Sequence, residues 1–145
     1  MIHLIAVAGY VTSHPLSIIL SIVSAFVLGF VWHGPLFGKQ WMAYSGITPP
    51  KKEDMKFSMM LPGIIASTVT VFLQSAVLGR TFQIVALQNL VQALLISTII
   101  CVPFTMMVIV NSYAWEGKKV GHMALSGGYN VISQWVIATI LYVTL

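Results

Sequence analysis

The chain has 145 residues, of which 58% are apolar and only 7% are charged. A soluble domain normally carries about 25% charged residues, and a single core of this size cannot shelter so much apolar surface from water. Together with a mean hydropathy of +0.93, this composition predicts an integral membrane protein. Lys and Arg outnumber Asp and Glu by seven to three, but all the charges fall in three short breaks between apolar runs. The basic excess therefore indicates membrane orientation rather than a nucleic-acid partner.

The first apolar run, residues 1–38, contains no charged side chain. As one helix it would be about 57 Å long, nearly twice the hydrocarbon thickness of about 30 Å. Ser13, His14 and Pro15 supply a break, because proline is favoured in a first helical turn and constrains the residue before it. We therefore predict a first span that begins at Pro15. Residues 1–12 are too short to cross, which places them at the membrane interface or against the bundle.

Three further apolar runs follow. Gly79, Arg80 and Thr81 are predicted to form a tight turn after the second span, and Pro103 is predicted to kink the third. The charged residues 116–119 precede the fourth span. The fold class is thus an all-α membrane protein, a single domain built as a four-transmembrane-helix bundle with an interfacial N-terminal segment. The predicted spans cover residues 15–32, 59–78, 84–110 and 122–143.

Basic residues are distributed unevenly over the loops between these spans. The loop over residues 33–58 holds four lysines and that over 111–121 holds two, whereas the remaining loop has only Arg80. Cytoplasmic loops carry an excess of Lys and Arg. We therefore expect both lysine-bearing loops on the cytoplasmic side of the cell membrane and both termini outside.

Small residues recur at one-turn spacing along the spans. Lipid tails are as apolar as leucine, so helices associate in membranes through close packing of small residues and through hydrogen bonds. Gly128 belongs to such a face on the fourth span. These faces join helices within one chain or between two chains, and the sequence leaves both open. The stripe on the first span consists of Ser17, Ser21, Ala25 and Gly29.

Amide side chains supply a second kind of contact. Gln88 and Gln92 are one turn apart in the predicted third span, and Gln74 is expected at a similar depth in the second. The plainer interpretation is structural pairing between helices. In the alternative, these residues line a polar path together with Asn89 and Gln134, although no intramembrane acid or base is present to drive coupling.

The candidate metal ligands are His33, which ends the first span, and His122, which begins the fourth. With Glu116 they would suit a metal that keeps open coordination positions. The sequence lacks the short His-x-x-x-His or Glu-x-x-His spacing, and histidines bonded to water or lipid headgroups are commoner at an interface. The single cysteine, Cys101, excludes a multi-cysteine site. We therefore assign no metal, no cofactor and no catalytic residue.

The strongest local sequence motif runs from Trp32 to Trp41. It resembles the signature of a family of small bacterial and archaeal membrane proteins known as domain of unknown function 1761. That signature has a glycine before an aromatic pair and then a Pro-Leu-Phe-Gly-Lys-x-Trp run. His33 stands where tyrosine is more usual. The matching residues are Gly29, Trp32, Pro35, Leu36, Phe37, Gly38, Lys39 and Trp41.

A second block, residues 111–118, resembles the family's Asn-x-x-Phe-Glu-Gly-Arg run, with Trp115 in place of the phenylalanine and Lys118 in place of the arginine. The same block continues with Gly128, Tyr129 and Asn130, which are similar to the family's later Gly-Tyr pair on the last span. The resemblance covers roughly residues 16–145 and implies four helices. It implies no activity, because none is established for the family.

Both blocks are predicted at the cytoplasmic face, so we expect them to contact each other. Lys39 is expected to pair with Glu116 in a clamp that Trp32 and Trp41 anchor at the interface. Asn111 is expected to hydrogen-bond backbone that Pro35 leaves free.

For function, we favour a non-catalytic protein that acts by helix–helix association, as a homo-oligomer or as an accessory subunit of a larger membrane protein complex. Its partners would be the lipid bilayer and membrane subunits, with no nucleic acid. A small dimeric transporter or channel with a glutamine-lined path is the alternative, and a metal-dependent membrane enzyme is the third hypothesis.

Overall fold

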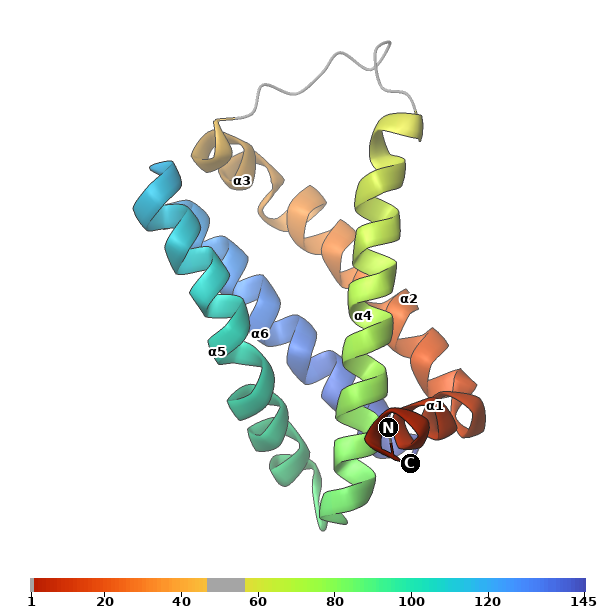
Figure 1. Ribbon diagram of the computed structural model, residues 1–145. Helices are drawn as coiled ribbons and strands as arrows, with labels where there is room; N and C mark the ends of the chain where they lie inside the picture. Colours follow the sequence, from red (N-terminus) through yellow and green to blue (C-terminus); the bar gives the residue numbers. More distant parts are fainter. Residues whose placement is uncertain (1, 47–56) are drawn as a thin grey trace.

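The structure is a computed structural model that describes residues 2–46 and 57–145, and every regular element in these ranges is helical. The long helices run side by side, with both termini at one end and α3 at the other (Figure 1). We call these the termini end and the α3 end. The segments are α1 (Ile2–Ser13), α2 (Pro15–Val31), the π-helical turn η1 (Trp32–Leu36), α3 (Gly38–Ser45), α4 (Phe57–Val85), α5 (Leu90–Glu116) and α6 (Val120–Val143).

Three of the described helices are long and apolar enough to cross a membrane, namely α2 with η1, α4 and α5. The predicted all-α fold is confirmed, and three of the four predicted spans meet this criterion of length and composition. The fourth, α6, has 24 residues but is more polar, since Asn130, Ser133 and Gln134 lie in its middle.

The polarity of α6 follows from its position in the bundle. It packs against α2, α3, α4 and α5, so neighbouring helices cover its polar middle. Ser133 and Gln134 are accordingly buried, as are Gly127 and Ala138. A helix surrounded by others gains more from small and hydrogen-bonding residues than from large apolar ones, which lowers its mean hydropathy.

The small-residue stripe of α2 faces the inside of the bundle. Ser17, Ser21 and Ala25 are buried. At Gly29, an added Cβ would lie 3.2 Å from the hydroxyl oxygen of Tyr129 on α6. Of the two possibilities left open by the sequence, this structure uses the stripe to join helices of one chain.

The N-terminal helix α1 packs against α4 and α2 at the termini end (Figure 1). Tyr10 is its buried anchor, and a Cβ at Gly79 of α4 would overlap the Tyr10 ring. The ring also stacks on His14, with centroids 4.6 Å apart. Burial raises the pKa of the Tyr10 hydroxyl by desolvation. The N-terminal segment therefore packs against the bundle.

The predicted turn at residues 79–81 is wrong, because α4 continues to Val85. Gly79 is a contact point inside the helix, and Arg80 donates from Nη1 to Oε1 of Gln83 at 3.1 Å. The chain reverses after Val85, where Ala86 has a positive φ of 51°.

The third long helix consequently begins at Leu90 rather than at residue 84, and it ends at Glu116. Asn89 is its N-cap, with the side-chain oxygen accepting from the Gln92 N–H at 3.0 Å. In return, Oε1 of Gln92 accepts from the Gln88 N–H at 2.8 Å. This reciprocal bonding satisfies backbone donors at the helix start and explains why the helix begins here.

Packing density differs between the two ends. In the fully described helices α4 and α5, no residue of α4 before Ser75 and none of α5 after Ser97 is buried. The α3-end halves of both helices thus have large faces that the described residues leave uncovered.

Gly79→Ala should weaken the docking of α1, because the new methyl group meets the Tyr10 ring. Overpacking of this kind typically costs about 1–3 kcal/mol, which thermal unfolding in detergent would reveal. Gly63→Ala on the same helix is the control, since nothing lies within 4 Å of its added Cβ. Equal melting temperatures for the two variants would contradict the proposed contact.

Candidate functional site

The first motif block folds into a π-helical turn that accommodates Pro35. The Phe37 N–H donates to the Trp32 carbonyl at 2.9 Å, five residues back, and the Trp41 N–H donates to the Phe37 carbonyl at 2.8 Å. A Cβ at Gly38 would lie 2.7 Å from the His33 carbonyl oxygen, so this position requires glycine. Backbone N–H groups around the break therefore find carbonyl acceptors within the same segment.

The two family-like blocks contact each other through Gly128 and Tyr129. A Cβ at Gly128 would lie 3.4 Å from Cζ2 of Trp32. The Tyr129 ring is 6.2 Å from that of Trp32 and 4.8 Å from that of His33, centroid to centroid. Its hydroxyl donates to the Ala25 carbonyl at 3.4 Å.

The expected clamp is not formed, and residues 111–118 do not make this contact. The Glu116 carboxylate accepts from the Ser112 hydroxyl at 3.2 Å, and the structure records no ion pair between Glu116 and Lys39 among residues 2–46 and 57–145. Lys119 makes the long-range bond to α3 instead. It donates to the Ala43 carbonyl at 3.4 Å. Asn111 is exposed on α5 and takes no part in the break.

His33 is held by the backbone one turn earlier. Its Nδ1 lies 3.2 Å from the Gly29 carbonyl oxygen, and because a carbonyl only accepts, Nδ1 carries the proton. The ring meets Trp41 edge to face, with centroids 5.6 Å apart. His122 is half-buried at the start of α6. Within the described part of the chain, no group of three or more His, Cys, Asp or Glu residues could hold a metal ion.

Beside His33 opens a cleft of about 730 Å³, which we call the aromatic cleft. One wall comes from α2, η1 and α3, a second from α4, and Tyr129 of α6 closes the third side. Its volume lies in the range of about 300–1,000 Å³ that is typical of small-molecule sites. Its aromatic lining is formed by Phe26, Phe30, His33, Trp41 and Tyr129, and its α4 lining by Met60, Gly63, Ile64 and Ser67.

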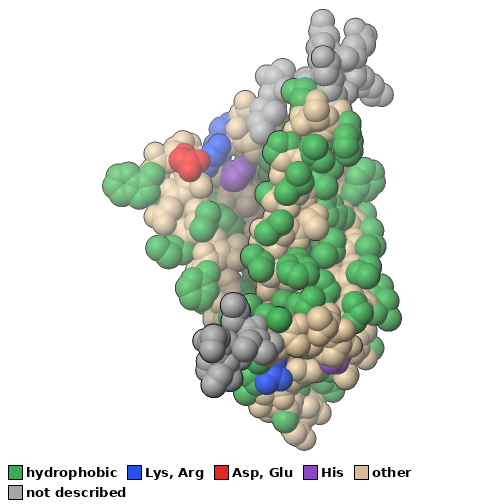
Figure 2. All heavy atoms as spheres, turned by 45° about the vertical axis from the view of Figure 1, so that its right-hand side comes forward, with side chains coloured by type: hydrophobic (Ala, Val, Ile, Leu, Met, Phe, Trp, Pro, Cys, Tyr) green, Lys and Arg blue, Asp and Glu red, His purple; other side chains and the backbone are tan. Residues whose placement is uncertain are grey.

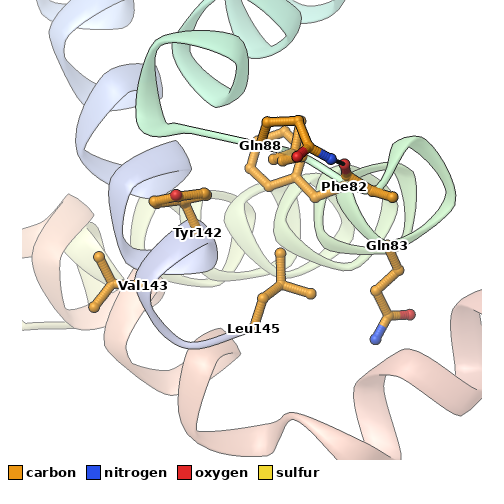
Figure 3. Close-up of a pocket in the computed structure, with 8 residues that line it drawn as sticks. Phe82, Gln83, Gln88, Tyr142, Val143 and Leu145 are labelled. Atoms are coloured by element: carbon orange, nitrogen blue, oxygen red, sulfur yellow. Dashed lines mark hydrogen bonds between the residues drawn. The ribbon is translucent and has the colours of Figure 1, made fainter.

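The structure places the glutamines of the expected polar path in different surroundings. Gln88 is exposed in the turn before α5, with its side-chain nitrogen donating to the Ala86 carbonyl at 2.9 Å. It borders a cavity of about 600 Å³ at the termini end. Gln83 also lines this cavity, with its side chain directed away from that of Gln88 (Figure 3). Gln92 serves the helix cap. Gln74 borders a separate cavity of about 370 Å³, together with Cys101.

The buried polar residues are serines and one glutamine. Ser21 and Ser97 donate to backbone carbonyls of their own helices at 2.8 and 2.9 Å. Oγ of Ser75 and Oε1 of Gln134 have no hydrogen-bond partner. The sequence prediction included Ser17 and Ser21 in the packing stripe but missed Ser75, Ser97 and Ser133, although small hydroxyl residues are a known contact class between membrane helices.

These features together define a small polytopic helical membrane protein. Hydrophobic side chains cover much of the face shown in Figure 2, and the Lys, Arg and Glu side chains visible there lie towards its two ends. The chain belongs to the family described as protein of unknown function (DUF1761), which matches residues 16–142. The resemblance found from the two motif blocks is thereby confirmed. No curated protein and no solved structure matches the chain.

Tyr129→Ala should destabilise the protein by roughly 2 kcal/mol, less than the 3–5 kcal/mol typical of fully buried aromatic residues. The substitution removes the contacts to Trp32, His33 and Gly29. Tyr113→Ala is the matched control, because Tyr113 is exposed on α5. Tyr129→Phe should retain most of the stability, since the hydroxyl bond is long. If both alanine variants unfold at the same temperature in detergent, Tyr129 does not hold the two blocks together.

Proposed function

We propose that the chain crosses the cell membrane four times, with the loops over residues 33–58 and 111–121 in the cytoplasm and both termini outside. The length of α6, about 36 Å at 1.5 Å per residue, supports a fourth crossing, as does its place among the other long helices. The α3 end would then be cytoplasmic. Lys39, Lys118 and Lys119 lie at that end, whereas Lys51, Lys52 and Lys56 fall outside the described residues.

The function best supported is non-catalytic association, with a second copy of the chain or with a larger membrane protein. The observation that carries this proposal is the uncovered α3-end half of α5. Phe104 is 73% exposed and Trp115 is 86% exposed. Asn111 and Trp115 belong to the run that resembles the family signature, yet both are exposed. A motif residue that is not packed inside the bundle is available to contact a partner.

Polar and aromatic side chains at this position suit a protein partner better than bulk lipid. Asparagine can hydrogen-bond across a helix interface, which is one of the few forces that hold helices together in a membrane. The neighbouring apolar residues Met107 and Val108 are 65% and 66% exposed and would pack against the same partner.

A photoreactive phenylalanine analogue at Phe104 should form protein adducts in intact membranes after irradiation. The same analogue at Val91, which is 62% exposed in the termini-end half of α5, is the control and should form few. An adduct of twice the chain mass identifies a second copy, and a larger adduct identifies another subunit. Protein adducts at neither position, or equally at both, would contradict association through this face.

A second candidate function, the passage of a small polar solute, is favoured by a different observation. Ser75 is fully buried and Gln134 is 5% exposed, and each has an unpaired oxygen. A solute or water entering the bundle centre could satisfy both atoms. This candidate ranks second because the buried polar residues are serines and a glutamine, which do not titrate and cannot couple movement to a proton.

The orientation can be tested by cysteine labelling in a Cys101→Ser background. A cysteine at Ala43, which is exposed in α3, should be protected from an impermeant thiol reagent in intact cells, because α3 is placed in the cytoplasm. A cysteine at Gln88, exposed in the turn at the termini end, should react. The reverse labelling pattern would invert the proposed topology.

A further inference from the structure

The aromatic cleft combines aromatic rings with polar side chains, and the proposed association through α5 does not explain this lining. It lies at the α3 end, where Trp41 lines it beside the half-buried His33. Gly63 and Ser67 of α4 contribute little bulk to their wall, and no atom of the described residues lies within 4 Å of a Cβ added at Gly63. Because this half of α4 is unburied, the cleft is open towards the surroundings of the bundle. In a bilayer those surroundings are lipid.

Two polar atoms of the cleft lining can accept a hydrogen bond from a ligand, one on His33 and one on Tyr129. Since Nδ1 of His33 donates to the Gly29 carbonyl, Nε2 is the ring nitrogen left to accept a hydrogen bond. The Tyr129 hydroxyl donates its hydrogen bond to the Ala25 carbonyl, so its oxygen can accept a hydrogen bond from a ligand. A ligand that fits these atoms must donate hydrogen bonds.

The aromatic rings add a preference for positive charge. The faces of Trp41, Tyr129 and Phe30 carry negative electrostatic potential and attract an ammonium group within about 6 Å. None of the described residues that line the cleft is Asp or Glu, so a free cation would find no counter-charge there. A zwitterion brings its own anion.

We propose that the aromatic cleft binds one phospholipid with a primary ammonium headgroup, as in phosphatidylethanolamine. The ammonium group enters among His33, Trp41 and Tyr129, and the phosphate remains at the mouth of the cleft. One acyl chain lies along the deeper apolar wall formed by Phe26 and Ile64. This site requires the chain to be in a membrane but does not depend on association through α5.

Native mass spectrometry of the full-length protein in mild detergent tests the proposal. The probes are dioleoyl phosphatidylethanolamine, phosphatidylcholine and phosphatidylglycerol, titrated separately. We expect one retained phosphatidylethanolamine per chain, bound about tenfold more tightly than the other two. Phosphatidylcholine has the charge but no N–H donor, and phosphatidylglycerol has donors but no cation. Equal binding of all three lipids would overturn the assignment of the headgroup.

Two variants locate the site. Ser67→Leu fills the cleft from α4 and should lower phosphatidylethanolamine binding about tenfold, whereas Ala66→Leu on the same exposed helix does not line the cleft and should leave binding unchanged. His33→Phe keeps a ring but removes the acceptor, so it should reduce the preference over phosphatidylcholine without lowering phosphatidylcholine binding. An equal effect of both leucine variants would place the lipid elsewhere. Dimers that disappear only in Ser67→Leu, with no lipid adduct, would make a second copy the occupant.

Discussion

The close packing of α6 against α2 is the constraint on which the rest of the structure depends. In lipid, large apolar side chains give no net attraction between helices, so contact must come from close approach. The two helices achieve this reciprocally. Gly29 receives the Tyr129 ring, and Gly128 receives the Trp32 ring. Each glycine thus makes room for an aromatic side chain from the other segment, and this exchange fixes the depth at which the α2 break and the start of α6 meet.

That exchange also determines where polar side chains can lie. Once α6 occupies the centre, its polar middle is shielded, and Gln134 is buried without contact with lipid. Two of the buried serines, Ser21 and Ser97, bond to carbonyls of their own helices. Such local bonds satisfy the hydroxyl groups but do not select a partner helix. The hydroxyl groups of these two serines therefore do not determine helix pairing.

Sequence reasoning succeeded where the physical signal is local. Apolar runs longer than the hydrocarbon thickness, and a serine–alanine–glycine stripe at one-turn spacing, depend only on residues near in sequence. The turn at Gly79 and Arg80 was misplaced because glycine and arginine are also typical of loops, and only the Tyr10 contact explains the glycine. The Asn89–Gln92 capping pair was a local signal that could have placed the helix start correctly.

The candidate site was harder to predict because its walls come from segments far apart in the sequence. His33, Ser67 and Tyr129 converge only after three helices have packed, and no spacing rule links them. Lys39 and Glu116 were expected to pair because they have opposite charges and a similar predicted depth in the membrane. The structure records no ion pair between them in the described residues. Depth alone is a weak restraint, because residues at one interface can lie on opposite sides of a bundle. Ring-on-glycine packing constrains both depth and direction, which explains why Gly128 and Tyr129, rather than the charged run, join the two motif blocks.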